Sequence, residues 1–318
     1  MKKFAILFLA LIMIMIPACG IDTPSNNSSN DFSNESNTDI PNSEDITSPN
    51  ESANPETDFE YLTVDNEVTI SGYIGQTKTV IIPEQISNKT VTRIGEEAFR
   101  SKEITSIKMP DSIRFIDRMA FQNCISLETV VLSNALSEIG LRAFENCTKL
   151  EQITLPSTLN TLGEEAFHQS GLKRLDIQAG LETIPAYAFA ATQLTQVVLP
   201  ESIKTIEFQA FAGCSLLTSV TLNEGLISIE HKAFATDTKI NEIKIPKTVH
   251  NITDMAFSGC SNLKKVVFLG DAPETYKYSD PISGVWAPFD SNYTIYFYQG
   301  AKGFTTPTWY DYPSEIIQ

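Results

Sequence analysis

The chain has 318 residues, 42% of them hydrophobic, and a formal net charge of -16 at pH 7. Because so acidic a protein repels phosphate groups, we expect no nucleic-acid partner and no charge-driven contact with anionic lipid. The length would ordinarily suggest two domains, but the internal repeat described below predicts one solenoid instead.

Residues 1–18 are typical of an export signal. Two lysines precede an apolar run over residues 4–16, which is too short to span a bilayer. The segment Pro17-Ala18-Cys19-Gly20 resembles the lipoprotein box of bacteria, in which a peptidase cuts before a cysteine that carries diacylglycerol. The resemblance implies lipidation of Cys19 and anchorage at the extracellular face of the cell membrane. A simple secretory signal, cut after Ala18, is the alternative.

Residues 19–58 are predicted to form a disordered tether. Ser and Asn supply 16 of residues 21–58, and nine acidic residues occur there without a Lys or Arg. So few apolar side chains cannot offset the entropy lost on ordering the chain. We therefore expect an extended acidic spacer between the membrane and the folded part.

The remainder is dominated by one repeated pattern. Residues 59–98 are rich in strand-forming residues and are predicted to form an N-terminal cap and a first, degenerate coil. The dipeptide Ala-Phe recurs at steps of 22 or 23 residues, with its Phe at positions 99, 121, 144, 167, 189, 211, 234 and 257. A fixed period of this size is typical of a stacked solenoid, here assigned to residues 99–269.

Each repeat carries the same apolar positions. A Leu-x-x-Val/Ile-x-Leu segment such as Leu150–Leu155 predicts a short parallel strand, and a Leu/Ile-x-x-Ile segment follows it. A short turn of α- or 3₁₀-helix is predicted to carry each Ala-Phe inward. The expected fold is an α/β solenoid of mostly short parallel strands with short helical turns.

The pattern resembles the BspA-like class of bacterial leucine-rich repeats over about residues 60–318. The repeat from Leu150 to Phe167, with Leu155-Pro156, Gly163 and Ala166-Phe167, fits that class almost residue by residue. The resemblance implies a non-enzymatic surface protein that acts in adhesion or in contact with a host or matrix.

Four cysteines share one position, three residues after the repeat Phe: Cys124, Cys147, Cys214 and Cys260. In other repeats the same position is filled by Ser170, Thr192 and Asp237. One buried slot for a small residue explains this better than a disulfide framework, so free buried thiols are predicted.

Little in the sequence favours catalysis, a metal or another cofactor. His168, His231 and His250 occupy three different positions of the repeat, whereas a metal site needs ligands that converge. The motifs of serine hydrolases, zinc proteases and phosphate-binding loops are lacking. A hydrolase is therefore the weakest of the functional alternatives.

Apolar side chains beside the Ala-Phe pairs are the first candidate binding surface. They are Met119, Leu141, Tyr187 and Phe208. Scattered exposure is the ordinary explanation, and a patch for a partner is the sharper one. We expect a protein or glycan partner outside the cell.

The aromatic tail over residues 270–318 is the second candidate surface. It contains both tryptophans, Trp286 and Trp309. One interpretation is a C-terminal cap that covers the last coil. The other is an aromatic platform for sugar, which would make the chain a carbohydrate-binding or envelope-polysaccharide accessory protein.

Overall fold

The computed structural model describes residues 52–178, 180–273, 293–310 and 312–318. The predicted signal peptide, Cys19 and Trp286 lie outside these residues. Across the described residues the chain forms no apolar helix of membrane-spanning length.

The folded part begins earlier than the composition predicts. The backbone N–H of Asn54 donates to the carbonyl of Ile81 at 2.9 Å, and the Asn54 side-chain oxygen accepts the N–H of Ile81 at 2.8 Å. A 3₁₀ turn, η1 (Glu56–Asp58), follows. Residues 54–58 were assigned to the tether but belong to the folded N-terminal end. Composition misses them because a few specific hydrogen bonds, rather than apolar content, fix their position.

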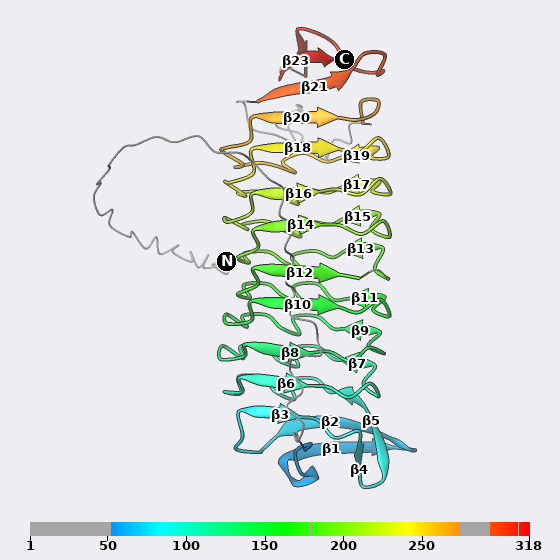
Figure 1. Ribbon diagram of the computed structural model, residues 1–318, viewed down its shortest axis with the longest axis vertical. Coiled ribbons are helices and arrows are strands. Elements are labelled where there is room, and N and C mark those ends of the chain that lie inside the picture. The colour runs from blue at the N-terminus through cyan, green and yellow to red at the C-terminus, as the bar shows by residue number, and fades with distance from the viewer. Residues whose placement is uncertain (1–51, 179, 274–292, 311) are drawn as a thin grey trace, which may run out of the picture. The chain divides into compact units, whose positions relative to one another are not determined.

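Two hairpins build the N-terminal end (Figure 1). Strand β1 (Phe59–Val64) pairs antiparallel with β2 (Glu67–Tyr73), and β4 (Gln85–Ile86) pairs antiparallel with β5 (Lys89–Ile94). Strand β2 joins β5 in parallel, and β5 continues into the repeats.

Each repeat forms one coil, whose first strand pairs in parallel with the equivalent strand of a neighbouring coil. The apolar positions of these strands point inward, so that Ile153 and Leu155 are buried while Thr154 between them is exposed. The strands of this first ladder pair in the groups β3-β6-β8, β10-β12, β14-β16 and β18-β20. Their bounds are β3 (Thr79–Ile81), β6 (Ser106–Lys108), β8 (Thr129–Val131), β10 (Gln152–Leu155), β12 (Arg174–Ile177), β14 (Gln196–Val198), β16 (Ser219–Thr221), β18 (Glu242–Ile245) and β20 (Lys265–Phe268).

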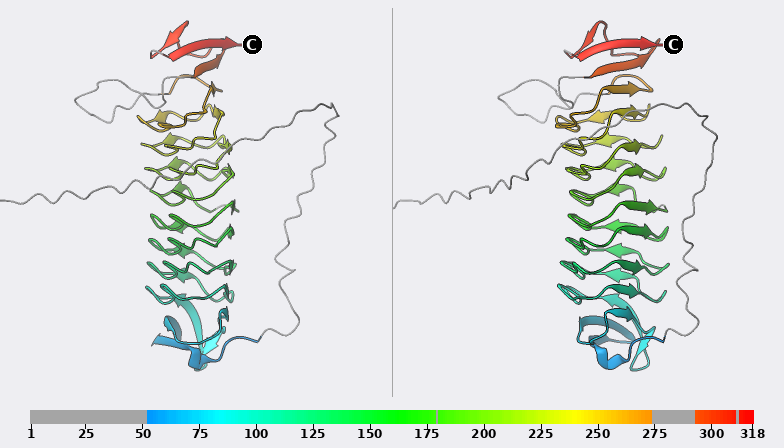
Figure 2. Two further views of the ribbon diagram at one scale, coloured as in Figure 1. Left: turned by 90° about the vertical axis from the view of Figure 1, so that its left-hand side faces the viewer. Right: turned by 60° about the vertical axis from the view of Figure 1, so that its left-hand side comes forward.

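A second ladder of two-residue strands follows in each coil. It runs in the groups β5-β7-β9-β11 and β13-β15-β17-β19, all parallel. Figure 2 shows the strands of successive coils lying above one another. The bounds are β7 (Phe115–Ile116), β9 (Glu138–Ile139), β11 (Thr161–Leu162), β13 (Thr183–Ile184), β15 (Thr205–Ile206), β17 (Ser228–Ile229) and β19 (Asn251–Ile252).

The segment around each Ala-Phe is a pair of tight turns, and the prediction of short helical turns is wrong. The described residues contain no α-helix. The residue two before each repeat Phe and the residue two after it have positive φ, between 51° and 78°. Left-handed residues at this spacing cannot continue a right-handed helix. Moreover, the N–H of Phe99 donates to the Ala120 carbonyl of the next coil at 2.8 Å, as Phe144 does to Ala166 at 2.7 Å. The turns therefore form a third ladder between coils.

The eight repeat phenylalanines stack in one column through the core. Each ring is fully buried, neighbouring ring centroids lie 4.9–5.5 Å apart, and neighbouring ring planes differ by 1–18°. This spacing is close to the strand separation of about 4.7–4.9 Å. At the N-terminal end Tyr73 stacks on Phe99 at 5.4 Å, and Phe59 covers Tyr73.

The cysteine position has a function in this packing. The thiol of Cys124 donates to the Phe99 carbonyl at 2.9 Å, and the thiol of Cys260 to the Phe234 carbonyl at 3.1 Å. The hydroxyl of Thr192, at the same position, instead donates to the Phe189 carbonyl of its own coil at 2.9 Å. All four repeat cysteines are buried thiols that form no disulfide, as predicted. Burial raises the pKa of Cys124 and Cys214 to about 12, so these thiols are protonated and unreactive at neutral pH.

The C-terminal tail extends the first ladder. Strands β21 (Thr294–Tyr298) and β23 (Tyr312–Ile317) continue in parallel from β20, and β22 (Thr308–Trp309) pairs antiparallel with β23. Trp309 is only 3% exposed, its ring lies against Phe268 and Phe304, and its Nε1–H donates to the Gly303 carbonyl at 2.8 Å.

Candidate functional site

The candidate site is the line of side chains around the turns, which we call the turn face. It comprises the residues at the third and second positions before each repeat Phe and the residue directly after it. Backbone hydrogen bonds between coils place these residues side by side. The N–H of Met119 donates to the Leu141 carbonyl at 2.9 Å, and the N–H of Tyr187 to the Phe208 carbonyl at 3.1 Å. The structure therefore brings the four predicted apolar residues together as two neighbouring pairs, all half-buried.

Aromatic rings form a continuous row on this face. The Tyr187 and Phe208 rings meet edge to face, with centroids 5.2 Å apart, and Phe208 stacks on His231 at 5.6 Å. The Tyr187 hydroxyl donates to Oε1 of Gln209 at 2.9 Å, and Nδ1 of His231 lies 3.1 Å from a carboxylate oxygen of Asp254. Met255 in the next coil is 43% exposed. Half-buried rings with fixed orientation are the kind of side chain that anchors protein interfaces.

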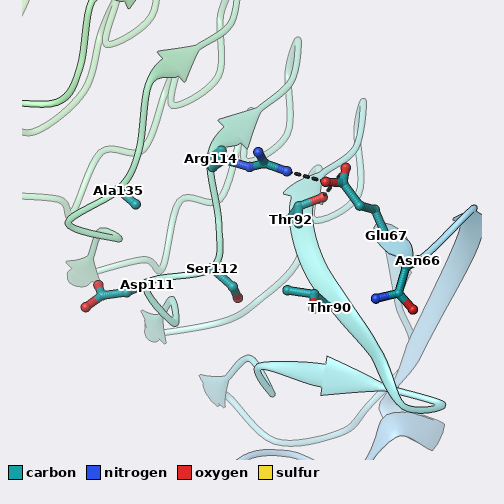
Figure 3. A pocket seen from close by; sticks show the side chains of 8 residues that line it. All are labelled: Asn66, Glu67, Thr90, Thr92, Asp111, Ser112, Arg114 and Ala135. Carbon is teal, nitrogen blue, oxygen red and sulfur yellow. Dashed lines mark hydrogen bonds and ion pairs between the residues drawn. The ribbon is translucent and has the colours of Figure 1, made fainter.

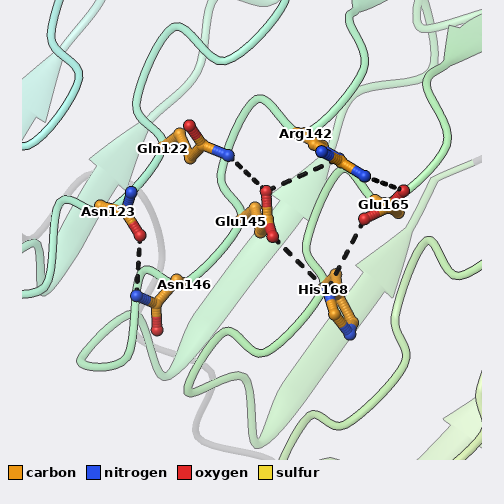
Figure 4. A network of polar contacts seen from close by, with 7 residues as sticks. All are labelled: Gln122, Asn123, Arg142, Glu145, Asn146, Glu165 and His168. Carbon is orange, nitrogen blue, oxygen red and sulfur yellow. Dashed lines mark hydrogen bonds and ion pairs between the residues drawn. The ribbon is translucent and has the colours of Figure 1, made fainter. Parts of the chain in front are cut away.

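A network of charged side chains precedes the aromatic row (Figure 4). Arg142 Nη2 donates to Glu165 Oε1 at 2.7 Å, and Gln122 Nε2 donates to Glu145 Oε2 at 2.5 Å. Nδ1 of His168 faces both carboxylates, 3.7 Å from Glu145 Oε1 and 3.9 Å from Glu165 Oε2. The hydrogen bond to Glu165 raises the pKa of Arg142 above its ordinary value.

The sequence prediction missed this convergence. His168, His231 and His250 do occupy different positions of the repeat, so the histidines alone show no convergence. However, Glu145 and His168 both directly follow the repeat Phe, in successive coils. Aligning each histidine with the carboxylates at its own position in neighbouring repeats would have found the cluster.

A second candidate is a shallow hollow of about 390 Å³ near the N-terminal end (Figure 3). Its polar lining includes Glu67, Thr92 and Arg114. Arg114 forms an ion pair with Glu67, whose other oxygen accepts the Thr92 hydroxyl at 3.2 Å. No His, Cys or Lys is among the lining residues that the structure describes, so the hollow offers no pairing of histidine with a nucleophile.

The tail does not offer the predicted pair of sugar-binding tryptophans. Trp309 is buried between Phe268 and Phe304, so its faces cannot stack on a sugar ring from solvent. Its indole N–H is already bonded within the tail. Trp286 lies outside the described residues.

Comparison with solved structures finds leucine-rich repeat proteins of several bacteria. A leucine-rich repeat protein of T. pallidum is 24% identical, with a TM-score of 0.43, and the match covers 71% of this chain and 86% of that one. A leucine-rich repeat protein of Eubacterium ventriosum is 23% identical, with a TM-score of 0.49 and coverages of 69% and 53%. A protein of Faecalibacterium prausnitzii described as a leucine rich cell surface protein is 18% identical, with a TM-score of 0.35 and coverages of 77% and 100%.

No curated protein shows a significant match to the chain. A family model, the BspA type leucine rich repeat region, matches six copies over residues 76–193 and 182–279, which is more than half of the chain. These residues contain the Ala-Phe turns, both strand ladders between β3 and β20, and the turn face. The chain therefore belongs to the family of BspA type leucine-rich repeat proteins.

Proposed function

We propose that the chain is a non-enzymatic, lipid-anchored surface protein that binds a protein partner through the aromatic part of the turn face. The observation that carries the proposal is the row Tyr187, Phe208 and His231, in which each ring is oriented by its neighbour. Repeat solenoids present continuous surfaces of this kind to partners. Membership in the leucine-rich repeat family supports binding rather than catalysis.

The first strand ladder is the competing face of the solenoid. Its exposed positions include Thr154, Val198 and Thr221, and Val198 is 61% exposed. These side chains are β-branched and form a shallow strip with no aromatic residue among them. The aromatic residues of this ladder that are not buried, Tyr296 and Tyr298, lie in β21 of the tail. Since binding energy concentrates in aromatic and Arg anchors, the turn face is the better candidate.

Replacing Phe208 by Ala is expected to weaken binding of the partner by about 30-fold or more, the loss typical of an interface hot spot. The full chain would be immobilised and probed against panels of extracellular-matrix proteins and of glycans, and the variant would be titrated with whichever binds. Val198→Ala serves as the matched control on the strand face and should bind as the wild type does.

The outcomes separate the candidate functions. Equal affinity of wild type and Phe208→Ala, with a loss in Val198→Ala, would place binding on the strand face. Binding to glycans alone would favour the carbohydrate-binding alternative, for which the tail still offers the exposed rings of Tyr298 and Tyr310 although Trp309 is buried.

Replacing Cys19 by Ser is expected to remove the lipid anchor and to leave the protein either unprocessed in the membrane or released to the medium. The change removes the thiol that would carry diacylglycerol but keeps the apolar run over residues 4–16. The net charge of -16 gives the chain no electrostatic hold on anionic lipid, so no second anchor masks the loss. Detergent-phase partitioning and mass spectrometry of the mature N-terminus check this. An unmodified Cys19 on the mature wild-type protein would contradict it.

A further inference from the structure

We propose that Glu145, Glu165 and His168 form a binding site for a divalent transition-metal ion of the zinc type. The proposal does not depend on the proposed partner-binding function. The three side chains come from two successive coils, and one potential ligand atom of each lies within 4.8 Å of the others. Figure 4 shows the two carboxylates and the imidazole pointing toward one another.

The imidazole nitrogen provides the main argument. Nδ1 of His168 is buried from solvent and has no hydrogen-bond partner. It faces Glu145 Oε1 at 3.7 Å and Glu165 Oε2 at 3.9 Å, too far for hydrogen bonds. In a tetrahedral zinc site the ligand atoms lie about 3.3 Å apart, given metal–ligand distances near 2.0–2.1 Å. An ion between the three atoms would supply the missing partner of Nδ1 once its distances to the two carboxylate oxygens shorten by about 0.4 and 0.6 Å and those two oxygens, which lie within 4.8 Å of each other, also move together.

Each of the three side chains is also contacted on the side that faces away from the cluster. These contacts hold one potential ligand atom of each toward the other two residues. Gln122, itself buried, donates to the outer oxygen of Glu145, and Arg142 donates to the outer oxygen of Glu165. The ring of Tyr187 lies edge-on to His168, with centroids 6.3 Å apart. Groups that orient ligands in this way are typical of metal sites, where their loss weakens metal affinity about 10–100-fold.

The ligand set selects the class of ion. One imidazole nitrogen with two carboxylate oxygens suits zinc, which takes four ligands, and the fourth position stays open to water or to a partner side chain. Calcium takes six to eight oxygen ligands and is a poor match. Arg142 contacts the outer carboxylate oxygens, so its charge does not occupy the position of the ion.

Zinc titration of the full chain, followed by isothermal calorimetry and equilibrium dialysis, tests the site. We expect saturable binding that His168→Ala weakens by more than about 100-fold, and that Gln122→Ala weakens by about 10–100-fold, because the second change leaves all three ligands in place. His231→Ala is the matched control, since His231 is a half-buried histidine of the same face that lies beside Asp254 and outside the cluster.

Circular dichroism establishes that each variant is folded. If His168→Ala does not fold, zinc binding is measured instead for the near-isosteric Glu145→Gln. We expect its affinity for zinc to fall to a similar extent. The proposal is overturned if the wild type does not bind zinc, if binding survives in the folded ligand variants, or if His231→Ala loses as much affinity as they do.

Discussion

Replacing Phe167 by Ala is expected to lower the free energy of unfolding by about 3–5 kcal/mol. Phe167 is fully buried in the middle of the phenylalanine column, and its ring stacks on Phe144 at 5.2 Å and on Phe189 at 5.5 Å. Truncation removes both ring contacts and leaves a cavity that coils held by three ladders cannot easily close.

Phe208→Ala is the matched control, because it deletes the same side chain from a half-buried position on the turn face. A surface change of this kind is expected to cost about 1 kcal/mol or less. Urea unfolding followed by circular dichroism compares the two variants. Equal midpoints would mean that the column is not the core of the solenoid.

Replacing Asp237 by Ser is expected to raise the free energy of unfolding at neutral pH by about 1–3 kcal/mol, the cost of an unsatisfied buried polar group. Asp237 is fully buried, and neither of its carboxyl oxygens has a hydrogen-bond partner. It occupies the position where the cysteines donate to a Phe carbonyl of the preceding coil. Serine removes the cost of burying a carboxylate and is already accommodated at this position as the buried Ser170, whose hydroxyl makes no hydrogen bond.

The gain should depend on pH with a definite sign. Burial raises the pKa of Asp237 well above its ordinary 3.8. With a folded-state pKa above the unfolded one, the wild type loses stability as pH rises from the unfolded pKa through the folded pKa. Asp237→Ser lacks this loss of stability. Its gain in the free energy of unfolding over the wild type is therefore large at pH 7 and shrinks as the pH falls toward 3.8.

Urea unfolding of both proteins across this pH range provides the measurement. Asp176→Ser, which removes an exposed carboxylate from β12, is the control and should leave the profile unchanged. A variant less stable than the wild type at pH 7 would contradict the assignment of Asp237 as an unsatisfied buried acid.

The strands could be predicted from the sequence because each repeat restates them. Ile153 and Leu155 alternate with polar residues, and the same alternation recurs at a fixed period, so burial in β10 followed from the pattern. The cysteine position could be predicted in the same way, since Ser170 and Thr192 at that position excluded a disulfide framework.

The first turn could not be predicted, because the left-handed residues two positions before each repeat Phe are ordinary ones. Met119 and Tyr187 have φ of 55° and 57°, although their side chains normally disfavour that region. The hydrogen bonds between coils impose the conformation, and these bonds are invisible in a single repeat. The second turn did carry a signal, since Asn123, Asn146, Gly213 and Gly259 are residue types that favour left-handed backbone.

The sequence also left two interpretations of the tail open, because an aromatic tail looks the same whether its rings cover a core or face solvent. The burial of Trp309 against Phe268 agrees with the cap.

The most direct test of the binding face is site-specific photo-crosslinking on intact cells that carry the full chain. A photoreactive phenylalanine analogue would be placed at Phe208 on the turn face or at Val198 on the strand face, both in the same stretch of coils. If the turn face binds the partner, we expect a discrete protein adduct from position 208 and none from position 198. An adduct from position 198 alone would contradict it and would move the binding surface to the strand ladder.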